Sequence, residues 1–411
     1  SARPARPEAG AAGLRSVQAG IEVADVFRAA ADWRTANDAH LSRDQRRVYA
    51  AVRACRTAKL GGHTEACGGC GYERIAYNSC RNRHCPKCQG AARRQWLADR
   101  QAELLPVGYF HVVFTLPPEL AAVALQNKTA VYGALFQVAA ETLRTIAADP
   151  RHLGAQIGGI AVLHTWGQAL QHHPHLHCIV PGGGLSPDGT RWIACRPGFF
   201  LPVRVLSALF RRLFLARLRQ LHAAGTLAFF GEIAHLADPA AFQHYLAPLR
   251  KRPWVVYAKP PFGSPEQVLA YLGRYTHRVA ITNARLTALN DGKVSFRWKD
   301  YRHHDKRKVM QLDVGEFSRR FLMHTLPGGF HRIRHFGLLA NGHRTAKLRQ
   351  CRALLACVGD APPDTSDAPA QPDAPGDTPD NPCPHCGGAM RFVAVVPRDA
   401  MAAGFEALDS S

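Results

Sequence analysis

Two cysteine pairs with the spacing Cys-x-x-Cys lie close together in the first quarter of the chain, at Cys67/Cys70 and at Cys85/Cys88. Each pair can bring two thiolates to one ion, and four thiolates form the tetrahedral shell that structural zinc prefers. A redox role is disfavoured, because no thioredoxin-like pattern of strand, helix and strand surrounds the pairs. The spacing therefore predicts a small zinc-binding domain in which Cys67, Cys70, Cys85 and Cys88 hold one zinc ion.

Further potential ligands surround these pairs. The residues that could hold a second zinc ion are Cys55, His63, Cys80 and His84. Two of them, Cys80 and His84, could instead pack against the first site. A third pair, Cys383/Cys386, follows a stretch rich in Pro and Asp. Cys351 and Cys357 could complete a zinc site with this pair; otherwise it is a free element of the tail.

The composition describes a folded and strongly basic protein. Hydrophobic residues make up 46% of the 411 residues, and the formal net charge is +21. Such a field attracts polyanions, with nucleic acid as the first candidate partner and an acidic membrane surface as the second. We find no apolar run long enough to cross a bilayer and no export signal. Cysteine pairs beside histidines then indicate metal in a reducing compartment, so we expect a cytoplasmic protein.

The segment from His173 to Val180 predicts a strand that carries a metal site. Alternate side chains share one face of a strand, so His175 and His177 point the same way and can clamp an ion. A strand predicted over residues 157–166 precedes this segment across a short turn. An antiparallel hairpin would place His164 beside the pair, and Gln168 is the alternative third ligand. For the pair alone, the competing interpretation is that both histidines merely face solvent.

Two tyrosines follow on a helix that the capping rules start at Ser264. Tyr271 and Tyr275 are four residues apart, so their hydroxyls project from one helical face. A divalent cation held by His175 and His177 could polarise a phosphodiester, which a tyrosine hydroxyl then attacks. The sequence has no GxxxxGK phosphate-binding loop, so we expect no nucleotide cofactor. The alternative is that both tyrosines face the core.

Four runs, in matching order, carry a family resemblance: Asn78-Ser79-Cys80-Arg81-Asn82-Arg83-His84-Cys85-Pro86-Lys87-Cys88, His164-Thr165-Trp166-Gly167, His173-Pro174-His175-Leu176-His177 and Tyr271-Leu272-Gly273-Arg274-Tyr275-Thr276-His277-Arg278. Over roughly residues 40 to 350 the chain resembles the rolling-circle transposases of the insertion sequence 91 family. These are two-tyrosine members of the His-hydrophobic-His (HUH) endonuclease superfamily. The resemblance implies an α+β fold with an HUH-type antiparallel central sheet and flanking helices. The histidines would lie on a middle strand, with the tyrosine helix packed across the sheet.

The resemblance also implies an activity. Such a transposase nicks and rejoins single-stranded DNA through a 5′-phosphotyrosine intermediate, and it moves an insertion sequence by a rolling-circle-like route. Tyr271 and Tyr275 would be the nucleophiles, and His175, His177 and His164 would hold Mg²⁺ or Mn²⁺. The arginines expected to contact DNA phosphates are Arg81, Arg83, Arg274 and Arg278.

The implied partner is single-stranded DNA at the element ends and target, which would bring the protein to the bacterial nucleoid. Two alternatives stay open. One is a plasmid or phage replication initiator or relaxase with the same chemistry. The other is a non-enzymatic zinc-finger DNA-binding protein.

The same reasoning divides the chain into six parts. A segment rich in Ala, Pro and Asp after Cys357 reads as a disordered linker, and the heavily basic stretch before it reads as a DNA-binding extension. The predicted parts are a flexible leader (1–22), a helical and zinc-binding DNA-contact domain (23–100), the HUH domain (101–300), the basic extension (301–358), the linker (359–382) and a knuckle tail (383–411).

Overall fold

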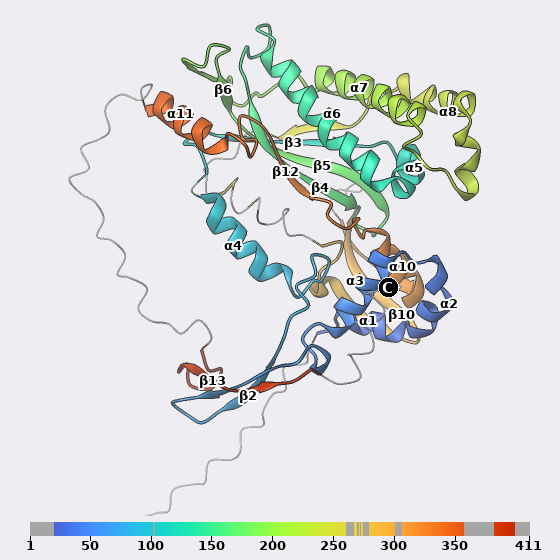
Figure 1. Ribbon diagram of the computed structural model, residues 1–411, viewed down its shortest axis with the longest axis vertical. Coiled ribbons are helices and arrows are strands. Elements are labelled where there is room, and N and C mark those ends of the chain that lie inside the picture. The colour runs from blue at the N-terminus through green and yellow to red at the C-terminus, as the bar shows by residue number, and fades with distance from the viewer. Residues whose placement is uncertain are drawn as a thin grey trace, which may run out of the picture.

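The protein is described here from a computed structural model. The structure describes residues 20–101, 103–259, 267–268, 271, 273, 279–300, 306–356 and 382–398. Residues 1–19 of the predicted leader and 359–381 of the predicted linker lie outside these residues. Figure 1 shows a body of sheet and long helices at one end, and smaller helical and sheet elements at the other.

A five-stranded antiparallel sheet forms the centre of the larger body. Its strands run in the order β12-β4-β5-β3-β8. Their bounds are β3 (Tyr109–Thr115), β4 (Gly158–Trp166), β5 (His172–Pro181), β8 (Val256–Lys259) and β12 (Ile333–Gly337). The predicted mixture of helices with antiparallel sheet is thereby confirmed. The histidine strand β5 lies in the middle of the sheet, and it forms a hairpin with β4.

Two long helices, α6 (Lys128–Ala148) and α7 (Val203–Ala223), cover one face of this sheet (Figure 1). Leu176, Cys178 and Val180 of β5 are buried in the core beneath them. Because side chains alternate along a strand, the histidines of β5 lie on the opposite face. The apolar positions of one strand therefore fix which face the histidines occupy.

The opposite face carries a smaller apolar cluster. Tyr109 and Ile179 of the sheet pack there with Val268 and Tyr271. Side chains from helix α4 (Gln89–Gln101) line the same cluster. The described residues of the segment 267–273 are helical, in agreement with the helix predicted for the tyrosines.

A second core joins the start of the chain to residues near 280–320. Its N-terminal helices are α1 (Val23–Ala29), α2 (Ala31–Ala36) and α3 (Arg43–Ala54), and Ser42 caps α3 by accepting from the backbone N–H of Gln45. They pack on helix α10 (Val314–Met323) and on the sheet β9 (Leu286–Asn290), β10 (Lys293–Asp300) and β11 (Lys306–Asp313). The turn at 290–292 joins β9 and β10, and Asp291 and Gly292 both have positive φ there.

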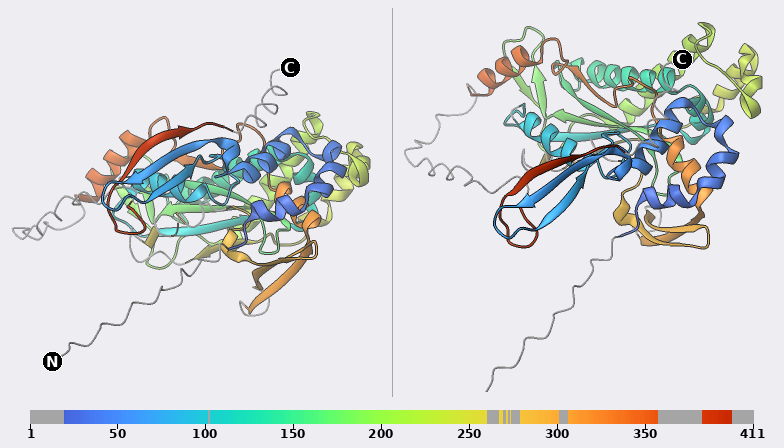
Figure 2. Two further views of the ribbon diagram at one scale, coloured as in Figure 1. Left: turned by 90° about the horizontal axis from the view of Figure 1, so that it is seen from below. Right: turned by 60° about the horizontal axis from the view of Figure 1, so that its bottom comes forward.

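A third sheet brings the two ends of the described chain together. It has the order β13-β1-β2, formed by β1 (Gly62–Cys67), β2 (Glu73–Tyr77) and β13 (Met390–Val396). Figure 2 shows the red C-terminal strand alongside the blue strands of the zinc-binding domain. Strand β1 therefore lies between its hairpin partner and a strand from the far end of the chain.

The remaining elements are peripheral. Helix α11 (Arg344–Ala356) packs near the small sheet of β6 (Gly183–Leu185) and β7 (Trp192–Ala194). The short helices are α5 (Ala121–Gln126), α8 (Pro239–Leu246), η1 (Asp38–His40), η2 (Ala58–Leu60), η3 (Pro118–Leu120), η4 (Gly231–Ala237), η5 (Pro248–Arg250) and η6 (Asn283–Arg285). In the described part of the chain, no helix combines the length and the apolar character that crossing a membrane requires.

Candidate active site and metal centres

The three predicted histidines lie together on the β4–β5 hairpin. His164 on β4 is directly opposite His175 on β5, and His177 is opposite Val162. Ring nitrogens from His164, His175 and His177 all lie within 4.8 Å of one another. His164 and His177 are buried, whereas His175 is half-buried. The cluster is thus a shielded site with one side toward solvent.

The ring orientations suit metal binding. His175 Nδ1 donates to the carbonyl of His173 at 2.7 Å, and His177 Nδ1 lies 2.8 Å from His111 Nε2. Such hydrogen bonds fix a ring and direct its other nitrogen, Nε2, at the ion. Three neutral imidazoles are a good donor set for a divalent cation. The histidines therefore fit the metal role that the sequence predicts.

Gln168, the alternative third ligand, lies in the turn between β4 and β5. Its backbone carbonyl accepts a hydrogen bond from Arg285 Nη2 at 2.6 Å.

His111 on β3 is a site residue that the sequence did not point to. It is 2% exposed, and its ring stacks on that of His177 with a centroid distance of 5.1 Å and an interplanar angle of 5°. Burial lowers the pKa of His111 to about 3, with smaller contributions from the charges of Lys259 and His175. The ring is therefore neutral. The one available signal was a histidine inside an otherwise apolar strand.

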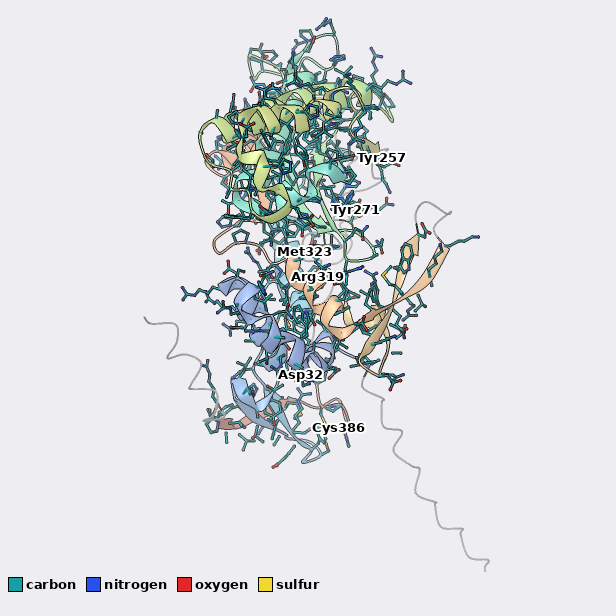
Figure 3. All side chains as sticks on the ribbon, turned by 90° about the vertical axis from the view of Figure 1, so that its right-hand side faces the viewer. Asp32, Tyr257, Tyr271, Arg319, Met323 and Cys386 are labelled. Atoms are coloured by element: carbon teal, nitrogen blue, oxygen red, sulfur yellow. The ribbon has the colours of Figure 1, made fainter. Side chains whose placement is uncertain are left out.

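Tyr271 completes a hydrogen-bonded chain to the histidines. Its hydroxyl lies 2.8 Å from His111 Nδ1 and 3.2 Å from His111 Nε2. The tyrosine is 8% exposed and packs against Ile179 of the sheet. In Figure 3, Tyr271 is labelled in the larger body, between Tyr257 and Met323 of α10. Tyr275, Arg274 and Arg278 lie outside the described residues.

The structure groups the cysteines differently from the prediction. One cluster is formed by Cys55, Cys80, Cys85 and Cys88, and its sulfurs all lie within 4.8 Å of one another. The predicted quartet of Cys67, Cys70, Cys85 and Cys88 is not found, because the β1–β2 hairpin carries the first pair away from the second. Hydrogen bonds from Cys80 and then Cys85 lower the pKa of Cys55 to about 2, which favours the thiolate that binds zinc.

The predicted second quartet also differs. Cys55 and Cys80 belong to the cluster just described, but the two histidines make other contacts. His63 Nε2 lies 2.9 Å from Glu65 Oε1 on the same strand. His84 Nε2 accepts from the backbone N–H of Leu326 at 3.4 Å. Both rings contact other protein groups, and neither belongs to a cysteine cluster.

One predicted DNA contact has a structural role. The guanidinium of Arg83 donates to three backbone carbonyls, those of Phe330 at 2.5 Å, Pro327 at 2.7 Å and Leu326 at 3.2 Å. These bonds use the groups that a phosphate contact would need, so Arg83 joins the zinc-binding domain to residues 326–330. Arg81 is exposed and has a left-handed backbone conformation, with φ of 51°.

Comparison with known proteins gives the family. Residues 26–116 match the family model described as "Transposase zinc-binding domain", and residues 158–347 match one described as "Putative transposase". The chain is 64% identical over 348 residues to "Putative transposase y4qJ" of Sinorhizobium fredii, a match that covers 85% of this chain and 87% of that protein. The chain belongs to the insertion sequence 91 family of transposases.

A more distant relative agrees with this assignment. The transposase is 29% identical over 297 residues to "Transposase for insertion sequence element IS801" of Pseudomonas savastanoi pv. phaseolicola, covering 70% of this chain and 68% of the other. No solved structure matches the chain described here. The two family models span the histidine cluster and the cluster of Cys55, Cys80, Cys85 and Cys88, whereas residues 382–398 lie beyond both.

Proposed function

We propose that this transposase nicks and rejoins single-stranded DNA, with Tyr271 as a nucleophile that forms a 5′-phosphotyrosine link, and that it thereby moves an insertion sequence by a rolling-circle-like route. The supporting observation is the chain of hydrogen bonds from the Tyr271 hydroxyl through His111 to His177. It connects a nucleophile to a candidate metal ligand within one buried cluster.

His164, His175 and His177 would hold Mg²⁺ or Mn²⁺, which would supply positive charge to the oxygens of the scissile phosphate. A strongly basic protein suits this substrate, since the formal net charge is +21. The tyrosine oxygen attacks phosphorus, forms a new O–P bond and displaces the 3′ oxygen of the preceding nucleotide. The hydroxyl proton leaves to water, and the 3′ oxygen takes up a proton as it departs.

The hydrogen bonds of His111 to His177 and Tyr271 support a role for His111 in positioning the tyrosine. If His177 offers Nε2 to a cation, its proton would lie on Nδ1, which would donate to His111 Nε2 at 2.8 Å. His111 would then carry its own proton on Nδ1 and would donate it toward the Tyr271 oxygen at 2.8 Å. A donor at this place orients the tyrosine and stabilises the phenolate that attacks and later leaves. His111 acts as a positioning residue instead of a general base.

The test is the fate of Tyr271. Tyr271→Phe removes the attacking oxygen, so we expect the adduct formed through this residue to vanish when the protein is incubated with single-stranded DNA and Mn²⁺. Mass spectrometry of tyrosine-linked peptides measures the adduct. Tyr257→Phe is the matched control, because Tyr257 is 51% exposed on β8. Unchanged adduct formation in Tyr271→Phe, or adducts on Tyr275 alone, would contradict the assignment of Tyr271.

A further inference from the structure

A second cluster of four cysteines joins the two ends of the described chain. Cys67 is the last residue of β1 and Cys70 lies in the turn after it, whereas Cys383 and Cys386 precede β13. The four sulfurs all lie within 4.8 Å of one another. Cys67 Sγ is 3.4 Å from Cys386 Sγ, and Cys70 Sγ is 3.6 Å from Cys383 Sγ. A tetrahedral zinc ion with Zn–S bonds of about 2.3 Å separates its sulfurs by about 3.8 Å, so the spacing suits one zinc ion.

The two Cys-x-x-Cys turns, at Cys67/Cys70 and at Cys383/Cys386, have the same backbone geometry. Gly71 N–H donates to the Cys67 carbonyl at 3.1 Å, and Gly387 N–H donates to the Cys383 carbonyl at 2.9 Å. Both glycines have left-handed backbone conformations, with φ of 72° and 75°. Glycine adopts such angles without the steric cost that other residues incur. The two cysteine pairs, far apart in the sequence, therefore lie in turns of the same type beside the four-sulfur cluster.

Backbone donors point at the sulfurs in both knuckles. Three N–H groups donate to the sulfur two residues before them, each at 3.4 Å: Gly69 to Cys67, His385 to Cys383 and Gly388 to Cys386. Donors of this kind stabilise thiolates, the form in which cysteine binds zinc.

Strand β13 has little else to hold it in place. It pairs with β1 from Gly62↔Val396 to Cys67↔Met390, but Phe392 is 63% exposed and Val395 is 71% exposed. Within residues 382–398, the buried residue is Cys383. A short strand ladder without an apolar core is marginally stable in water. Its attachment therefore needs a contribution beyond backbone pairing.

We propose that Cys67, Cys70, Cys383 and Cys386 hold a second structural zinc ion, which fastens β13 to the zinc-binding domain. The ring of Tyr72 stacks on that of His385 at a centroid distance of 4.4 Å, directly beside the sulfurs. Figure 3 shows Cys386 low in the smaller part of the molecule, well below Tyr271. The ion is therefore a structural link between chain ends, separate from the candidate active site.

Zinc content of the full chain tests the proposal. Native mass spectrometry should show that Cys383→Ser with Cys386→Ser binds one zinc equivalent fewer than the parent protein. Cys67→Ser with Cys70→Ser should lose the same single equivalent. Matched controls are Cys195→Ser and Cys351→Ser, which should lose none; the second also tests the alternative pairing predicted from the sequence. An unchanged zinc count in Cys383→Ser with Cys386→Ser would overturn the proposal.

Two further measurements separate loss of the ion from misfolding. Cys383→His should keep the full zinc count, because histidine is also a zinc ligand. Hydrogen exchange of the β1 amides that pair with β13 should become at least tenfold faster in Cys383→Ser with Cys386→Ser, and stay unchanged in Cys195→Ser. Equal protection of β1 in the double variant would show that zinc does not fasten the strand.

Discussion

The histidine cluster and the second cysteine cluster are built in opposite ways. His164, His175 and His177 come from one hairpin, whose register sets them side by side. Cys67 and Cys386 are 319 residues apart in the sequence, and the strand that follows the second pair is mostly exposed. We therefore expect packing to assemble the first site before an ion binds, and we expect the proposed zinc ion to contribute to assembling the second.

This difference leads to different expectations when ligands are removed. A site assembled by packing should lose its chemistry but keep its fold. A site assembled by its ion should lose local structure together with the ion. The three predictions that follow test this contrast at the histidines, at their neighbour His111 and at a metal-free link between the domains.

The largest effect is expected from His175→Ala with His177→Ala. Without these ligands the scissile phosphate loses its cation, and we expect adduct formation with single-stranded DNA to fall by about 10³-fold or more. The melting temperature should change little, because Leu176 and Cys178 continue to anchor β5 in the core. Adduct yield and thermal melting measure the two effects.

His173→Ala is the matched control for this pair. His173 contributes its backbone carbonyl to His175, and an alanine keeps that carbonyl. We expect its activity to remain within about threefold of the parent protein. A large fall in melting temperature for the double variant would show that the ion also builds the histidine site, and the contrast between the two centres would then disappear.

A smaller effect is expected from His111→Leu. Leucine fills the buried space but cannot bridge Tyr271 and His177, so the tyrosine loses its donor and the metal ligand loses its partner. Loss of such a supporting hydrogen bond costs roughly 10- to 100-fold in metal affinity or activity. Titration with Mn²⁺ should show a weaker apparent affinity together with a slower maximal rate of adduct formation.

His111→Gln separates positioning from packing. Its amide can both donate and accept, so we expect it to recover part of the lost rate. If His111→Leu formed adducts at the parental rate and with the parental Mn²⁺ dependence, the hydrogen-bonded chain would have no role in the reaction.

Sequence reasoning succeeded where the determinants are local. The hairpin of β4 and β5 needs only a short turn and the alternation of side chains, so the positions of His164, His175 and His177 could be predicted. His111 could not, because its place beside His177 depends on the register between β3 and β5, which are separated in the sequence by η3, α5, α6 and β4. Pairing of distant strands is decided by the packing of the whole sheet.

The grouping of the cysteines also depends on contacts between distant parts of the chain, so the sequence could not predict it. Spacing identifies a pair that can share an ion, but it does not say which two pairs meet. One signal was available: Gly71 and Gly387 each follow the second cysteine of a pair, whereas Gln89 follows Cys88. The similarity between the Cys67/Cys70 and Cys383/Cys386 turns could therefore be recognised in the sequence. Their meeting depends on β13 pairing with β1, a contact between the two ends of the chain.

The smallest effect is expected at Arg83, which links the zinc-binding domain to residues 326–330 without a metal. Arg83→Ala leaves three backbone carbonyls without their donor, and we expect the free energy of unfolding to fall by about 2 kcal/mol. Arg81→Ala, at an exposed position, should change it by less than about 0.5 kcal/mol. Urea denaturation measures both values.

DNA binding distinguishes this structural role from the phosphate contact predicted for Arg83. Arg83 already donates to carbonyls, so its removal should leave the salt dependence of single-stranded DNA binding unchanged, whereas loss of a phosphate contact would reduce the slope by about 0.7. Arg83→Lys should not restore stability, because a single ammonium cannot reproduce the guanidinium fork. If Arg83→Ala reduced the salt dependence of DNA binding and left stability unchanged, Arg83 would be a phosphate contact, as the sequence predicts.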